Sequence, residues 1–114
     1  MSANLTNRQV GDIAVIDVAG RITISEGATA LRDALRDLGA KGQKKILLNL
    51  GEVSYLDSSG IGELVSGLAT ITNQGGQLKL LNVTKRVKDL LVITRLWPVF
   101  EAHDDESTAI RSYK

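Results

Sequence analysis

The stretch Leu56–Val65, read LDSSGIGELV, decides the fold because it joins two elements of different kinds. Before it, the apolar run Ile46–Leu50 is short and continuous, which is typical of a buried interior strand. After it, apolar residues recur at the three- and four-residue spacing of an amphipathic helix, at Ile61, Leu64, Val65, Leu68 and Ile71. The sequence therefore predicts a strand, a polar turn and a helix that ends near Gly75-Gly76.

The polar turn holds the residues of chemical interest. Asp57, Ser58 and Ser59 are helix-capping types, since a side-chain oxygen accepts one of the free N–H groups of the first turn. Gly60 and Gly62 allow a tight turn and the close approach of another chain. A junction of this kind presents hydroxyl groups beside the positive end of a helix, where a phosphate is favourably placed.

An ordinary capped turn is the alternative interpretation of this stretch. Two adjacent hydroxyls exceed what capping needs, however. Gly62 and Gly67 each destabilise a helix by roughly 1 kcal/mol relative to alanine. Local preferences broken twice beside a polar junction indicate either close packing or a docking surface.

Length and composition limit the class of protein. With 114 residues, 43% apolar and 24% charged, the chain has the composition of one globular domain spanning residues 1–114. The formal net charge of +1 argues against a nucleic-acid-binding or membrane-binding surface. The lack of cysteine excludes disulfides and thiolate metal sites. No apolar run is long enough to span a bilayer and the N-terminus lacks the pattern of a signal peptide, so a cytoplasmic protein is expected.

Two strands are predicted before the first helix. They cover Asn4–Val10 and Ile13–Ala19, with a hairpin turn at Gly11-Asp12 between them. The second strand is apolar on both faces except at Asp17, which favours a place inside the sheet, and Gly20-Arg21 is expected to end it.

A helix is predicted to follow at once. Thr23 and Glu26 have the spacing of a capping box, and Ser25 is a second possible cap, so the helix is expected to start at Thr23 or Ser25. Gly39 and Gly42 mark its end. Its buried stripe comprises Ala28, Leu31, Leu35 and Leu38.

The C-terminal half is predicted to alternate strands and helices. Leu78–Val83 forms a strand, and Thr84 caps a helix whose inward positions are Val87, Leu90, Leu91 and Thr94. Pro98 prevents that helix from continuing, Val99–His103 forms an edge strand, and a short terminal helix starts at residues 104–106.

Three cations, Lys85, Arg86 and Lys88, crowd the first turn of the helix that Thr84 caps. The helix dipole disfavours positive charge at this end. The run is either a docking patch or, as is commoner, a solvated face.

The predicted order is that of an α/β fold. Strand–helix–strand units with right-handed crossovers produce a mostly parallel central sheet of four to five strands with one antiparallel strand, flanked by about four helices.

The pattern does not support an enzyme. A serine nucleophile needs a base, and the single histidine, His103, lies beside an acidic cluster near the C-terminus, where an exposed polar role is expected. The G-x-S-x-G motif, metal-ligand spacings, a P-loop and a dinucleotide fingerprint are all missing. A serine hydrolase is therefore the least favoured hypothesis, and neither a cofactor nor a metal is expected.

Several segments closely resemble the bacterial anti-sigma factor antagonists of the STAS domain family, the SpoIIAA-like proteins. They are LNL, GEVSYLDSSGIGEL, GGQLKLLNV and TKRVKDLLVITRL, and the likeness covers essentially the whole chain. The resemblance implies a small cytoplasmic STAS-type domain. It implies that Ser58 is phosphorylated by an anti-sigma factor that is itself a serine kinase using ATP and magnesium, and dephosphorylated by a metal-dependent serine phosphatase. The unphosphorylated form would bind the anti-sigma factor and free a sigma factor.

The resemblance also implies a partner-binding surface. It would comprise Asp57, Ser58, Ser59, Gly60, Ile61 and Gly62, together with Arg21 and Thr23. At the last two positions the chain departs from the family, where many members carry acidic residues in a G-E-hydrophobic-D pattern. A monomer or weak dimer is expected. The alternative is a STAS scaffold or transporter-associated subunit that binds a partner without a phosphoswitch.

Overall fold

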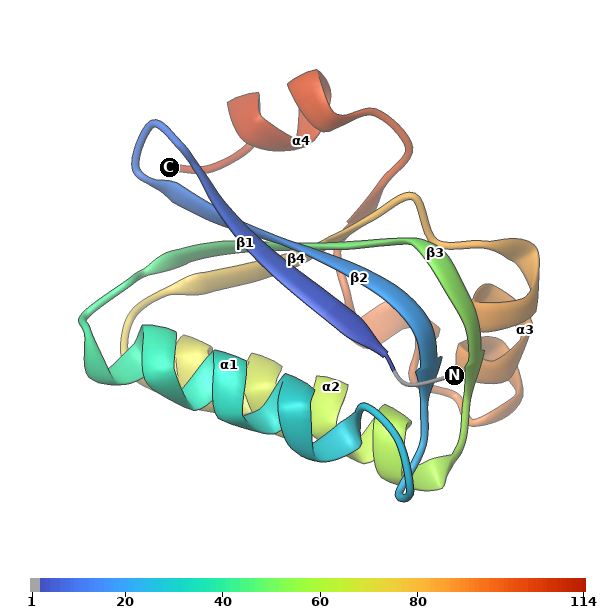
Figure 1. Ribbon diagram of the computed structural model, residues 1–114. Coiled ribbons are helices and arrows are strands. Elements are labelled where there is room, and N and C mark those ends of the chain that lie inside the picture. The colour runs from blue at the N-terminus through green and yellow to red at the C-terminus, as the bar shows by residue number, and fades with distance from the viewer. Residues whose placement is uncertain (1–2) are drawn as a thin grey trace.

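The computed structural model describes residues 3–114, which form a twisted sheet with helices on both faces (Figure 1). The elements follow in the order β1 (Asn4–Val10), β2 (Ile13–Ile22), α1 (Ala28–Ala40), β3 (Lys45–Leu56), α2 (Ser58–Asn73), β4 (Gln77–Leu81), α3 (Lys85–Ile93), the short 3-10 helix η1 (Trp97–Val99), β5 (Ala102–His103) and α4 (Glu106–Arg111). The predicted alternation of strands and helices is confirmed.

The five strands of the sheet lie in sequence order, β1-β2-β3-β4-β5. β1 and β2 form an antiparallel hairpin, and every later pair is parallel. This arrangement confirms the predicted α/β class with one antiparallel strand. It also places the polar junction after β3 at the carboxyl edge of the parallel strands, where α/β folds present binding sites.

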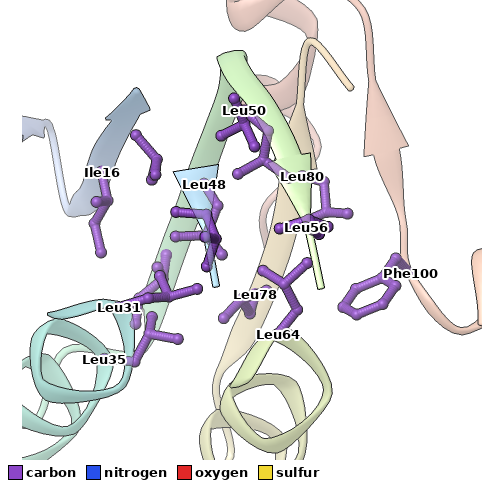
Figure 2. Packing of buried hydrophobic residues seen from close by; sticks show 14 of the residues in the cluster. Ile16, Leu31, Leu35, Leu48, Leu50, Leu56, Leu64, Leu78, Leu80 and Phe100 are labelled. Carbon is purple, nitrogen blue, oxygen red and sulfur yellow. The ribbon is translucent and has the colours of Figure 1, made fainter. Parts of the chain in front are cut away.

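The core has two parts because both faces of the sheet are covered. Leu31, Leu48 and Leu64 belong to the larger part, between the sheet and α1, α2 and α3 (Figure 2). The smaller part lies under α4, where Ala109 packs on Leu47 and its neighbours. Burial on both faces explains why the central run of β3 is continuously apolar rather than alternating.

The prediction for the segment after β2 was wrong in two respects. β2 continues past Gly20-Arg21 to Ile22, which pairs with Leu56 of β3. The helix does not begin at a capping box: α1 begins at Ala28, after Gly27 with φ +81°. The Thr23 hydroxyl does accept the Glu26 N–H, at 3.1 Å, but that bond closes a loop rather than starting a helix.

At the other end of α1, Gly39 lies inside the helix, and Gly42, with φ +79°, follows it. The buried stripe of α1 is confirmed at Ala28, Leu31, Leu35 and Leu38. β4 stops at Leu81, two residues before the predicted end.

Thr84 caps α3 as predicted, its hydroxyl accepting the Val87 N–H at 3.3 Å. Thr94 was wrongly placed inside: it is exposed after the last turn, and its hydroxyl donates to the Leu90 carbonyl at 2.9 Å. The predicted last strand is shorter than expected, because its first residue, Val99, belongs to η1.

Candidate functional site

The carboxylate of Asp57 organises the junction between β3 and α2. Asp57 is the N-cap of α2, and its Oδ1 accepts the Gly60 N–H at 2.9 Å. Its Oδ2 accepts the Ile24 N–H, also at 2.9 Å. Hydrogen bonds from the backbone of Ile24 and then of Gly60 favour the ionised form, so the pKa of Asp57 lies below its ordinary value.

Gly60 is required by packing. The end of β2 lies against the first turn of α2, where the Ile22 carbonyl accepts the Asp57 N–H at 3.2 Å. A Cβ on Gly60 would lie 2.2 Å from that carbonyl oxygen, well inside van der Waals contact. Gly67 also has a packing role, since its Cβ would lie 2.4 Å from Leu35 Cδ1 on α1.

Gly62 has no such role. It is exposed, and a Cβ there would meet nothing within 4 Å. Ser58, four residues earlier, is also exposed and therefore lies on the same face of the helix, whereas Ser59 is half-buried. The sequence suggested close packing or a docking surface as explanations for the glycines, and different glycines fit the two. Gly60 and Gly67 allow close packing within the chain, and Gly62 leaves the surface beside Ser58 without a side chain.

The loop of residues 23–27 lies against this junction. Thr23 is only 6% exposed, and its backbone and hydroxyl close the loop on Glu26. Its side chain therefore shapes the loop from inside. Ile24 is 77% exposed, an unusual state for a large apolar residue held by a defined hydrogen bond.

Sequence reasoning missed Ile24 as a site residue, because the segment was interpreted as the start of a helix. The available signal was an apolar residue between Thr23 and Ser25 in a turn closed by Gly27. Of the other predicted residues, Ile61 is 8% exposed and packs into the core.

Arg21 lies to one side of the junction rather than in it. It is exposed, and its guanidinium carbon lies 5.5 Å from the centre of the Tyr55 ring, a cation–π arrangement. Arg21 also faces Tyr55 in the β2–β3 register, one residue pair before Ile22 and Leu56. The structure thus brings residues 57–62 and 23–27 together and leaves Arg21 on a neighbouring surface.

The single histidine of the chain, which a serine nucleophile would need as its base, is paired with a carboxylate. The Nε2 atom of His103 lies 2.7 Å from Glu101 Oε2, and its side chain is 17% exposed, whereas an exposed polar group was expected. Within residues 3–114, no cluster of three or more His, Asp or Glu side chains is arranged to hold a metal ion. None of the helices described there combines the length and apolar character that crossing a membrane requires.

The chain is similar to known proteins in both sequence and fold. Residues 4–109 match the STAS domain family. The chain is 33% identical over 101 residues to the anti-sigma-B factor antagonist of Bacillus subtilis, covering 89% of the chain and 91% of that protein. Its fold is similar to that of an anti-sigma factor antagonist from Mycobacterium paratuberculosis, with a TM-score of 0.87 at 19% identity over 98% of the chain and 94% of that structure.

The fold is also similar, though less closely, to two structures of the anti-sigma factor antagonist SpoIIAA. The match to the unphosphorylated form covers 95% of this chain and 96% of the SpoIIAA chain. The match to the phosphorylated form covers 95% of this chain and 98% of the SpoIIAA chain. Both give a TM-score of 0.74 at 20% identity. Anti-sigma factor antagonists are non-enzymatic regulators, in agreement with the prediction that the chain is not an enzyme. The chain belongs to the STAS domain family and is a homologue of its anti-sigma factor antagonists.

Proposed function

We propose that this chain is an anti-sigma factor antagonist switched by phosphorylation of Ser58. Its unphosphorylated form binds an anti-sigma factor that is also a serine kinase, and so releases a sigma factor. The kinase phosphorylates Ser58 and ends the interaction. A metal-dependent serine phosphatase removes the phosphate, and the cycle takes place in the cytoplasm.

The observation that carries this proposal is that Ser58 is exposed on the same helix face as Gly62, which has no side chain. A protein kinase must bring its active site over the acceptor hydroxyl, and a side chain four residues further along the same helix face would obstruct that approach. Glycine at position 62 destabilises the helix, yet no neighbour within residues 3–114 needs its small size. A partner that approaches Ser58 closely would need the small size of Gly62. The half-buried state of Ser59 supports Ser58 as the acceptor.

The neighbouring residues complete the proposed contact surface. Asp57 holds the loop of residues 23–27 against the helix end, and Ile24 projects from that loop as an apolar contact. Gly60 and Thr23 act from inside by setting the shape of the surface. A chain acting as a monomer or weak dimer leaves this surface free for the partner.

The phosphate is proposed to act at the interface rather than on the fold. Phosphoserine carries about −1.5 to −2 charge, which the helix dipole favours by roughly 0.3–1 kcal/mol and which the nearby Asp57 carboxylate opposes. These effects are similar in size and opposite in sign, so the fold should barely change. Similarity to SpoIIAA in both of its forms supports this expectation.

Binding to the partner should respond much more strongly. Burying a phosphate without a compensating cation costs several kcal/mol. Even about 3 kcal/mol weakens binding on the order of a hundredfold.

Phosphopeptide mapping tests the assignment. The chain is incubated with the anti-sigma serine kinase, ATP and magnesium, and the modified peptide is sequenced by mass spectrometry. Phosphate is expected on Ser58, with none on Ser58→Ala and normal incorporation in the control Ser59→Ala. Modification of Ser59 alone would contradict the assignment. A chain that binds a membrane transporter or a large assembly and accepts no phosphate would instead support the scaffold alternative.

A further inference from the structure

A second surface lies beside the proposed site, between the end of β3 and the first turns of α3. It is an open groove of about 430 Å³ lined by Tyr55, Lys85, Arg86, Asp89 and Leu90. Arg21 stacks over the Tyr55 ring. We call the five lining residues the basic groove, which Arg21 flanks.

The cations of α3 are placed against the preference of the helix. Its first turn contains no acidic residue, although the positive end of a helix favours negative charge. Lys85 is paired with Asp89 at 2.8 Å, and the Lys88 ammonium lies 5.1 Å from the centre of the Trp97 ring. Arg86 is exposed, and its side chain makes no hydrogen bond or ion pair within residues 3–114. An anion from outside the chain would offset the unfavourable interaction between these cations and the positive end of the helix.

Cations from two separate elements lie around Tyr55, one of them lining the groove and the other flanking it. Arg21 comes from β2 and Arg86 from α3, and Tyr55 belongs to the groove and stacks with Arg21. The Asp89 carboxylate, the acidic group of the groove lining, is already bound to Lys85. Leu90 adds an apolar contact, so the groove combines a free guanidinium with aromatic and aliphatic surface. That combination is typical of protein–protein interfaces, where arginine and tyrosine are enriched.

We propose that the basic groove docks a carboxylate-rich segment of the anti-sigma factor, with at least one apolar side chain against Tyr55 and Leu90. The inference rests on the proposed function for the identity of the partner. The groove lies close to the proposed site along the chain, because Tyr55 precedes Asp57 by two residues at the end of β3. A protein segment is favoured over nucleic acid because the net charge is only +1 and the cations are confined to one small groove.

A defined probe tests the recognition chemistry without the kinase. The 15N-labelled chain is titrated with a short capped peptide of glutamate and leucine, followed by amide chemical shifts. The shifts should cluster at Tyr55, Arg86 and Leu90, and affinity should fall about tenfold between about 20 mM and about 300 mM salt. The same peptide with lysine in place of glutamate should not bind.

Charge reversal supplies the matched comparison. Arg86→Glu should weaken peptide binding about tenfold, whereas Arg36→Glu, at an exposed arginine on α1, should change it less than about twofold. Thermal melts check that both variants fold. Equal losses in the two variants, shifts spread over all basic residues, or no binding would each overturn the proposal. Tighter binding of a single-stranded oligonucleotide at the same residues would overturn it in favour of nucleic acid.

Association and phosphorylation measurements with the anti-sigma factor distinguish the groove proposal from the phosphoswitch proposal. Arg86→Glu should lower the association rate and reduce its salt dependence, while Ser58 is still phosphorylated at saturating kinase. If Arg86→Glu associates at the wild-type rate and Ser58 is phosphorylated normally, the docking role of the basic groove is wrong and the proposed phosphoswitch stands. Peptide binding in a chain that accepts no phosphate on Ser58 would defeat the phosphoswitch and the assignment of this partner.

Discussion

The side chain of Asp57 holds the backbone of Ile24, although 33 residues separate them in the sequence: Asp57 Oδ2 accepts the Ile24 N–H at 2.9 Å. The other oxygen of the same carboxylate caps α2 through Gly60. One side chain therefore fastens the loop of residues 23–27 to the helix end that carries Ser58. The exposed side chain of Ile24 is held in a fixed position beside the proposed phosphorylation site, which lowers the entropy lost on binding.

Asp57→Asn should separate these two roles. An amide keeps one oxygen to accept from Gly60, but its NH₂ group cannot accept the Ile24 N–H. The helix cap should survive and the loop should loosen. Hydrogen exchange is expected to show lost protection at the Ile24 amide with protection at Gly60 retained. Equal protection at Ile24 in the variant and the wild type would show that Asp57 does not hold the loop.

Ile24→Ala should weaken binding to the anti-sigma factor without affecting stability. The side chain is 77% exposed, so its truncation removes little intramolecular packing, whereas a buried interface anchor commonly contributes 2 kcal/mol or more. We expect a loss of binding of at least about tenfold by calorimetry. Ile93→Ala is the matched control, because Ile93 is an isoleucine with the same 77% exposure on α3. Similar small effects of the two substitutions would remove Ile24 from the interface.

Gly62→Ala should stabilise the fold and impair the function. Its Cβ meets nothing, so the helix should gain roughly 1 kcal/mol in the free energy of unfolding, while the added methyl group obstructs the approach to Ser58. Gly60→Ala should instead lose about 1–3 kcal/mol, because its Cβ would collide with the Ile22 carbonyl. Thermal melts and rates of phosphorylation measure the two effects. Unchanged phosphorylation of a stabilised Gly62→Ala variant would argue against a close-fitting partner there.

Acid should unfold the protein partly through an ion-pair network on the opposite face of the sheet. Arg8 donates to Asp17 at 2.6 Å and binds Glu106 at 2.5 Å. Hydrogen bonds from Arg8 lower the pKa of both carboxyls. The unfolded chain therefore binds more protons, and the stabilisation is present above about pH 4 and is lost as the pH falls below it.

The loss of stability on acidification should be smaller in Arg8→Met, which removes the donor, than in the wild type. Urea unfolding at a series of pH values measures the difference. Because all three side chains are about a third exposed, solvent screening keeps the contribution modest. Parallel pH profiles for the two proteins would show that Arg8 does not set these pKa values.

Sequence reasoning succeeded where the signals are local. The run Ile46–Leu50 predicted the first part of β3, which continues to Leu56, and the spacing from Ile61 to Ile71 predicted α2. The capping residues Asp57 and Thr84 lie where their side-chain oxygens can reach the helix N–H groups. Burial on both faces, turn chemistry and helix spacing all act within a few residues, so they can be seen in the sequence.

Reasoning failed where a distant partner decides the outcome. Thr23 and Glu26 fit a capping box, but no helix starts there. The Ile24 N–H donates to the Asp57 carboxylate, and Gly27 adopts φ +81° before α1 begins. The extension of β2 to Ile22 likewise depends on pairing with Leu56 of β3. No short-range pattern contains those contacts, and they are the ones that bring Ile24 to the proposed site.

The binding isotherm of the anti-sigma factor measures the proposed phosphoswitch most directly. It is recorded with the unphosphorylated chain, the chain phosphorylated at Ser58, Ser58→Ala and Ser58→Asp, each checked by circular dichroism melts. All four should keep the fold. Ser58→Ala should bind like the unphosphorylated chain, the phosphorylated chain on the order of a hundredfold more weakly, and Ser58→Asp in between because it carries less charge. Equal binding of the phosphorylated and unphosphorylated chains, or loss of the fold on phosphorylation, would contradict a switch that acts at the interface.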